Sequence, residues 1–199
     1  MKDLELSMPA EYQVENATLA IETILNLKKF GFEISETHIR HALKTSFFPG
    51  RFELLRYKIL NTKYQILLDG AHNPEKMHAI ITSLQKVYPH ERKVFLLAFK
   101  EDKNIKEMLK EIIPVADVII CTEFSSEVYV SNQKAMKAES IKYKVLSIKY
   151  AKKKNIIIEP DLKKALDILL SQLQQNSSLG IVTGSLYLVG EVRGKLKNL

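Results

Sequence analysis

The sequence predicts an α/β fold, in which a mostly parallel β-sheet with flanking helices is preceded by a short all-helical segment. From residue 47 onward, short apolar runs alternate with stretches whose apolar residues recur at helical spacing. Parallel neighbours need a crossover connection, and this alternation supplies one each time. The chain has 199 residues, 46% of them hydrophobic, so it can bury a full core.

The first 46 residues contain only helical patterns. Apolar residues recur every three or four positions between residues 14 and 30, and Gly31 can end that helix. A second, shorter helix is predicted over residues 36–45, with Ser35 as its N-cap. The apolar positions are Val14, Ala17, Ile21, Ile24 and Leu25 in the first helix, and the inward-facing positions are Ile39, Ala42 and Leu43 in the second.

The pattern changes to strand-like runs after a Phe-Pro-Gly turn at residues 48–50. Two such runs follow it, over residues 52–60 and 64–68. We therefore expect two units, a helical one over residues 1–46 and an α/β one over residues 47–199.

The rest of the chain alternates helix and strand. The pattern predicts, in order, a helix over residues 77–87, a strand over 94–99, a helix capped by Asn104, strands over 117–121 and 156–158, a helix capped by Asp161, a strand over 179–182 and a helix over 185–197. Residues 125–150 show no sustained period and receive no prediction. Ligands bind beyond the carboxyl ends of the strands in open parallel sheets, so the site is expected there.

Composition excludes several classes of function. No stretch reaches the roughly 20 apolar residues that span a bilayer, and the first residues carry charges of both signs, so we expect a cytoplasmic protein without a membrane partner. The single cysteine, Cys121, ends an apolar run and is expected to be a buried, inert thiol. The histidines other than His72 show no ligand spacing, and no metal site is predicted.

The formal net charge of +7 is concentrated in residues 134–154, which hold eight lysines and one acidic residue. A solvated surface is the simpler interpretation, because the stretch has no arginine and only two aromatic residues, whereas nucleic-acid surfaces use both. No nucleic-acid partner is expected. Binding of a polyanion through this stretch stays an alternative.

The strongest local signal is Asp-Gly-Ala-His-Asn-Pro at residues 69–74, directly after an apolar run. Gly70 permits a sharp turn, and Asn73 with the proline after it suits a helix start. The exposed N–H groups and the dipole of such a helix favour an anion, which Asp69 and His72 would flank. The alternative is a plain helix start, with the Asp69 carboxylate satisfied by local N–H groups.

Two further segments point to a ligand site. Residues 183–187 form a second junction of strand, glycine and helix, with a hydroxyl at the helix start. Residues 49–51 place an arginine directly after a Pro-Gly turn. Three such segments in one chain are harder to explain as ordinary turns than one alone.

Residues 48–53, 69–74 and 184–192 resemble, in order and spacing, the signature segments of folylpolyglutamate synthase and dihydrofolate synthase. Weaker similarities at residues 13–20 and 102–104 extend the resemblance over nearly the whole chain.

That family is part of the Mur ligase group, so the resemblance implies a Rossmann-like C-terminal glutamate ligase domain over residues 47–199. It also implies that residues 1–46 are the helical tail of the central ATPase domain. The P-loop motif G-x-x-x-x-G-K-[ST] of such a domain is absent from this sequence. The resemblance therefore covers only the second half of the enzyme.

The resemblance implies an ATP-dependent ligase that adds L-glutamate to folate or tetrahydrofolate through an acyl phosphate, with or without dihydrofolate synthase activity. ATP and Mg²⁺ would be the cofactors of the complete enzyme, and none is expected to bind tightly to this chain alone. The expected partners are ATP, L-glutamate, folate and the missing ATPase domain. A monomer that is inactive without its P-loop half is expected.

The nucleotide-binding residues that the resemblance implies are Asn16 at the adenine, Arg51 at the ATP phosphates and Asp69 at the ribose hydroxyls. The chain departs from the family pattern just before this helix, where Tyr12 and its neighbours replace an expected glycine and histidine.

The resemblance also implies residues for the reaction itself. His72 would be the catalytic residue near the phosphate or the reaction centre. Lys103 would bind the carboxylate of the incoming glutamate, and Ser185 would hydrogen-bond the same substrate.

Two alternatives to this function come from other interpretations of the same segments. One is a Rossmann-like module that binds nucleotide or glutamate without catalysis. The other is a Mur-type ligase domain for a different amino acid.

Overall fold

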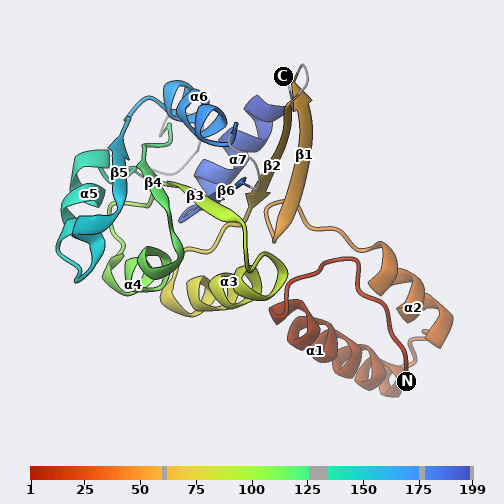
Figure 1. The fold of residues 1–199 in the computed structure, drawn as a ribbon. Coiled ribbons are helices and arrows are strands. Elements are labelled where there is room, and N and C mark those ends of the chain that lie inside the picture. Colours follow the sequence, from red (N-terminus) through yellow and green to blue (C-terminus); the bar gives the residue numbers. More distant parts are fainter. Residues whose placement is uncertain (60–61, 126–133, 175–177, 198–199) are drawn as a thin grey trace.

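The computed structural model describes residues 1–59, 62–125, 134–174 and 178–197, and shows an α/β domain with a helical segment beside it (Figure 1). The sheet has six strands in the order β1-β2-β6-β3-β4-β5. The strands are β1 (Glu53–Ile59), β2 (Thr62–Leu68), β3 (Arg92–Leu97), β4 (Val118–Cys121), β5 (Asn155–Ile158) and β6 (Ser178–Thr183). No described helix combines the length and apolar character needed to cross a bilayer.

The sheet is mostly parallel, as the alternation of elements predicts. β1 and β2 form an antiparallel hairpin, while β6 pairs in parallel with both β2 and β3, and the parallel pairing continues through β4 to β5. Leu68 at the end of β2 lies opposite Val182 of β6, and Leu97 at the end of β3 lies opposite Thr183. The carboxyl ends of these central strands therefore meet at one edge of the sheet.

Helices cover both faces of the sheet (Figure 1). α3 (Pro74–Val87), α4 (Lys106–Val115) and α5 (Ala138–Leu146) pack on one face. The other face is covered by α6 (Leu162–Gln172) and α7 (Leu186–Leu196). Phe95 and Leu97 belong to the first cluster and Val94 and Leu96 to the second, as the alternation of side chains along a strand requires. Because helices cover both faces of the sheet, the central strands need apolar side chains on both sides, and their sequences are continuous apolar runs.

The helical segment contains α1 (Tyr12–Leu27), the 3₁₀ helix η1 (Lys28–Phe30) and α2 (Glu36–Thr45). α1 continues directly into η1, which Gly31 ends with a φ of 87°. The Ser35 hydroxyl caps α2 by accepting from the His38 N–H, as the sequence predicts. The predicted apolar positions are less buried than expected. Val14 is 55% exposed, and Ala42 is also exposed.

Two local predictions are wrong or incomplete. The Asn104 side chain does not cap α4, because Ile105 stands at the N-cap position and makes no side-chain cap bond. The nearest Asn104 contact is a long one, 3.4 Å from Oδ1 to the Lys106 nitrogen. Part of the segment without a prediction, 125–150, forms α5 and the 3₁₀ helix η2 (Ala151–Lys153) follows it, while residues 126–133 lie outside the described chain.

Candidate functional site

The three segments that the sequence singles out contact one another through their backbones. The Gly70 N–H donates to the Gly50 carbonyl at 2.9 Å, and the Gly184 N–H donates to the Ala71 carbonyl at 3.1 Å. Gly184 has a φ of 102°, and a Cβ atom there would lie 2.6 Å from the Ala98 carbonyl oxygen, so only glycine fits. The predicted junctions after β2 and β6 therefore meet at one edge of the sheet, next to the turn that carries Arg51.

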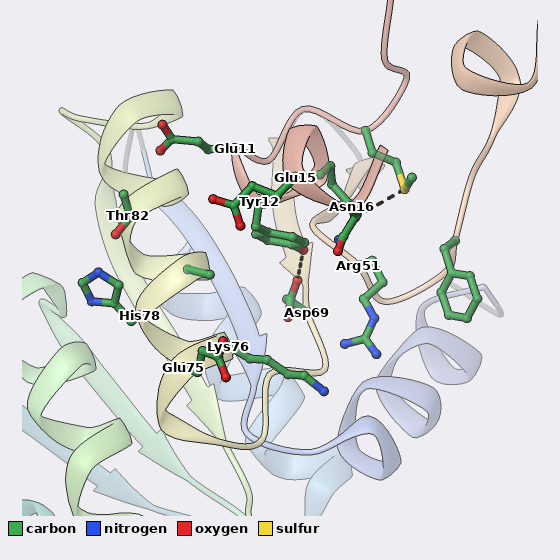
Figure 2. A pocket seen from close by; sticks show the side chains of 14 residues that line it. Glu11, Tyr12, Glu15, Asn16, Arg51, Asp69, Glu75, Lys76, His78 and Thr82 are labelled. Carbon is green, nitrogen blue, oxygen red and sulfur yellow. Dashed lines mark hydrogen bonds between the residues drawn. The ribbon is translucent and has the colours of Figure 1, made fainter. Parts of the chain in front are cut away.

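Arg51 lies in a tight turn between two residues with positive φ. Gly50 has a φ of 71° and Phe52 a φ of 49°. The Phe52 ring is 2% exposed and stacks on Tyr88 with 6.4 Å between ring centroids. Figure 2 shows the Arg51 guanidinium extending into the cavity beside Asp69. Among the described residues, Arg51 forms no ion pair.

Asp69 is almost fully enclosed, with 3% of its surface exposed. Its Oδ1 accepts from the Ala71 N–H at 2.9 Å, and its Oδ2 accepts from the Phe52 N–H at 2.9 Å and from the Tyr12 hydroxyl at 2.7 Å. Burial raises the pKa of the Asp69 carboxyl, although these three donors and the nearby Arg51 oppose that rise. Burial also raises the pKa of Tyr12, which stays a neutral donor.

An open cavity of about 800 Å³ lies between the start of α1, the Arg51 turn and the start of α3 (Figure 2). Its lining consists of Met8, Glu11, Tyr12, Gln13, Glu15, Asn16, Phe48, Arg51, Asp69, Glu75, Lys76, His78, Ala79 and Thr82. Lys76 stands in the first turn of α3, whose N-cap Asn73 accepts from the Lys76 N–H at 2.9 Å. Two cations and a helix N-terminus thus meet at one side of the cavity, an arrangement that suits a polyanionic ligand.

Asn16 lines the same cavity from α1. Its side-chain amide donates to Gln13 Oε1 at 3.0 Å, and Gln13 is the one buried residue of α1. The Asn16 carbonyl oxygen is left for a ligand, because the bond to Gln13 uses the nitrogen. Of the six residues that the resemblance implies, Asn16, Arg51 and Asp69 therefore share one cavity.

The other three implied residues are not part of the cavity lining. His72 is half-buried, and its Nδ1 lies 2.8 Å from the Gly70 carbonyl oxygen. Ser185 is 2% exposed, and its hydroxyl accepts from the Tyr187 N–H as the N-cap of α7. The Lys103 Nζ is 3.7 Å from an Asp102 carboxylate oxygen, well along the chain from the β2 junction.

Among the lining residues that sequence reasoning did not assign to the site, Lys76 and Tyr12 have the most direct bearing on it. Lys76 follows the helix cap by three positions, so its place in the first turn of α3 was a usable signal for an anion site. In the sequence, Tyr12 stands out only because it departs from the family pattern. Its contact with Asp69 joins residues 57 positions apart, so no local pattern predicts it. Across the described ranges, no three histidine, cysteine or acidic side chains gather as a metal site would require.

Comparisons with known proteins show the family of this chain. Residues 53–197 match the family model of the dihydrofolate synthetase C-terminal domain. Dihydrofolate synthetase of Saccharomyces cerevisiae is 29% identical over 193 residues, which cover 94% of this chain and 44% of that protein.

Solved structures show the same fold. The folylpolyglutamate synthase of Thermotoga maritima is 30% identical, with a TM-score of 0.69 over 99% of this chain and 41% of that one. The Mycobacterium tuberculosis folylpolyglutamate synthase, solved with ADP and AMPPCP, is 24% identical, with a TM-score of 0.79 over 97% of this chain and 42% of that one.

The chain spans less than half the length of these relatives. Within that span the match is continuous, because the family model covers most of the chain and all six strands of the sheet. The protein therefore belongs to the family of the dihydrofolate synthetase C-terminal domain, and it is similar to folylpolyglutamate and dihydrofolate synthases.

Proposed function

We propose that this chain is the C-terminal part of an ATP-dependent ligase that adds L-glutamate to a folate through an acyl phosphate, with or without dihydrofolate synthase activity. The observation that carries the proposal is the cavity at the sheet edge, where Arg51 extends without an ion-pair partner among the described residues. An arginine held in this way can bind phosphate oxygens with two parallel hydrogen bonds. The relatives named above are synthases of this reaction class.

In this proposal the nucleotide lies along the cavity. Arg51 contacts its phosphates, with Lys76 as a second cation, and Asn16 contacts the adenine. The Asp69 carboxylate accepts a hydrogen bond from a ribose hydroxyl. Since Tyr12 already donates to Asp69 Oδ2, a ribose hydroxyl binds there only by replacing the Tyr12 hydroxyl or by using a remaining lone pair of the carboxylate.

The reaction centre lies beyond the cavity, on the side of the two junctions. The His72 Nδ1 is held by the Gly70 carbonyl, which leaves Nε2 to contact the transferred phosphate. Lys103 binds the carboxylate of the incoming glutamate. Ser185 has the weakest support, because its hydroxyl is buried and already accepts a hydrogen bond as a helix cap.

We further propose that residues 1–46 are the tail of an ATPase domain that supplies the P-loop, and that residues 47–199 are the glutamate ligase domain. Most of the exposed large apolar side chains of the described residues lie near the amino terminus, namely Met1, Val14, Leu19, Leu25, Phe30, Phe32, Phe47 and Phe48. Such an apolar surface is typical of an interface. ATP and Mg²⁺ would act in the complete enzyme, and the isolated chain should not turn over.

Nucleotide binding is tested by titrating isotope-labelled protein with ADP and following its amide signals. Arg51→Ala should weaken ADP binding by about 10- to 150-fold, since charge-assisted hydrogen bonds contribute about 1.5–3 kcal/mol. Arg56→Ala is the matched control, because Arg56 is exposed on β1 and does not line the cavity. Equal losses in the two variants would contradict the proposed phosphate contact.

Turnover is tested separately. The chain is mixed with ATP, Mg²⁺, glutamate and tetrahydrofolate, and phosphate release is measured. No release above background is expected, because positioning and charge neutralisation by the P-loop half are missing. Steady release of phosphate with consumption of glutamate would contradict the need for a second half.

A further inference from the structure

We propose that Glu53 is a positioning residue that fixes the Gly50–Arg51 turn and thereby aims the Arg51 guanidinium into the cavity. This inference rests on the proposed function, because it matters only if Arg51 binds the ligand. Glu53 lies two positions after Arg51, at the first residue of β1, and is 4% exposed. It does not line the cavity, so it acts through the turn and not on the ligand.

The Glu53 carboxylate connects the turn to α7. Its Oε2 accepts from the Gly50 N–H at 2.8 Å. The Arg193 Nε donates to both carboxylate oxygens, at 2.9 and 3.0 Å, from a position 140 residues further along the chain. A buried carboxylate with both a cation and a backbone donor has a fixed position, since leaving it unpaired is costly.

The turn needs these fixed contacts because its backbone is strained. Phe52 has a φ of 49°, which a bulky residue adopts only when its surroundings impose it. Four hydrogen bonds fix the backbone around Arg51: the Arg51 N–H to the Phe48 carbonyl, the Gly50 N–H to Glu53, the Gly70 N–H to the Gly50 carbonyl, and the Phe52 N–H to Asp69. Two of these bonds are accepted by buried carboxylates that also contact a helix, Asp69 through Tyr12 of α1 and Glu53 through Arg193 of α7. Of the two carboxylates, only that of Glu53 lies outside the lining of the cavity.

Packing points to the same connection. A Cβ atom on Gly50 would lie 2.8 Å from Val189 Cγ1, so the turn lies directly against α7. Arg193 stands one helical turn after Val189 on the same helix. α7 therefore contacts the turn through an apolar side chain and holds it through the Glu53 ion pair.

A double-mutant cycle distinguishes positioning from plain stabilisation. ADP dissociation constants are measured for the wild type, Glu53→Ala, Arg51→Ala and the double variant, at a temperature where all four are folded by circular dichroism. If Glu53 acts through Arg51, Glu53→Ala should weaken ADP about fivefold to tenfold in the wild type but less than about twofold when Arg51 is already absent. The Gly50 amide should exchange faster in both backgrounds.

Two more variants complete the test. Glu53→Gln keeps an acceptor for the Gly50 N–H but removes the ion pair with Arg193, so ADP binding should weaken less than in Glu53→Ala. Weakening as large as that of Glu53→Ala would show that the bond to Gly50 does not fix the turn. If Glu53→Ala does not fold, Glu53→Asp replaces it, because the shorter side chain retracts the carboxylate from Gly50.

The outcomes separate the two proposals. If Glu53→Ala leaves the ADP dissociation constant unchanged while Arg51→Ala still weakens ADP binding, the role of Glu53 is overturned and the proposed function is not. Equal weakening by Glu53→Ala in both backgrounds would do the same, because it would show that Glu53 does not act through Arg51. Insensitivity of ADP binding to Arg51→Ala would overturn the proposed function itself.

Discussion

α1 and α3 are helices of similar apolar pattern in the two parts of this protein, but they are buried to very different extents. α3 buries Met77, Ile80, Ile81, Ser83 and Leu84 against the sheet, whereas Gln13 is the one buried residue of α1. The start of α1 nevertheless contacts the α/β domain. The Tyr12 hydroxyl donates a hydrogen bond to Asp69, and the Glu11 N–H donates one to the Ser83 hydroxyl at 3.1 Å. Helical periodicity thus shows that a helix has an apolar face, but not which molecule covers it.

The largest expected difference between the two parts comes from one substitution made in both helices. Leu84→Ala in α3 removes a fully buried side chain and should lower the free energy of unfolding by about 2–5 kcal/mol. Leu19→Ala in α1 removes a side chain that is 70% exposed and should change it by no more than about 0.5 kcal/mol. Urea unfolding of both variants measures this. Similar losses would show that α1 is packed as firmly as α3.

A smaller effect is expected where the two parts touch. Tyr12→Phe removes the hydroxyl that donates to the buried Asp69 carboxylate, and should cost about 1.5–3 kcal/mol. Amides in the first turn of α1 should then exchange faster than those of α3. Tyr143→Phe is the control, because Tyr143 is 75% exposed, and should stay within about 0.5 kcal/mol of the wild type. Unchanged exchange in α1 would show that other contacts hold it.

The smallest effect concerns acid stability. The N-cap bond from the Lys164 N–H lowers the pKa of Asp161 at α6, and the Lys44 ammonium lowers the pKa of Glu5 in the helical segment. Each group therefore adds stability that is complete above its unfolded pKa and is lost as the pH falls through its lower folded pKa.

Asp161→Asn should flatten the fall in unfolding free energy below about pH 4, because α6 unfolds with the core. Glu5→Gln should leave the same curve unchanged, since its segment contributes little to the global transition. Urea unfolding at several acidic pH values checks both. An equal change in the two variants would contradict this independence.

Local signals in the sequence were enough for most of the α/β fold. In α6 the Asp161 cap is confirmed, because a cap and a helix face are encoded within a few residues. The apolar residues at helical spacing after this cap are all buried, namely Leu162, Ala165, Leu166, Leu169 and Leu173. The Asn104 prediction was wrong by one position, because Ile105 stands at the N-cap of α4 and the Asn104 side chain makes only a long contact with the Lys106 N–H. α5 was missed because it is short and only three of its residues are buried, Ala138, Ile141 and Val145.

The site was less predictable than the fold. The strand ends at Asp69 and Thr183 could be placed at one edge from topology alone. The contacts of Asp69 with Tyr12 and of Glu53 with Arg193 join residues 57 and 140 positions apart, so no local pattern contains them. The roles of the six implied residues stay predictions, of which the geometry favours Asn16, Arg51 and Asp69 most.

The strand at the open margin of the sheet, β5, has a consequence for solubility at high concentration. It has only four residues, and among the described residues it pairs only with β4, so its other side offers backbone groups to a neighbouring molecule. Lys152 and Lys153 precede it and Pro160 follows it, and all three are exposed. Repulsion between like charges and the missing N–H of proline discourage strand addition. The lysine-rich stretch can thus protect the protein from edge-to-edge aggregation without binding any polyanion.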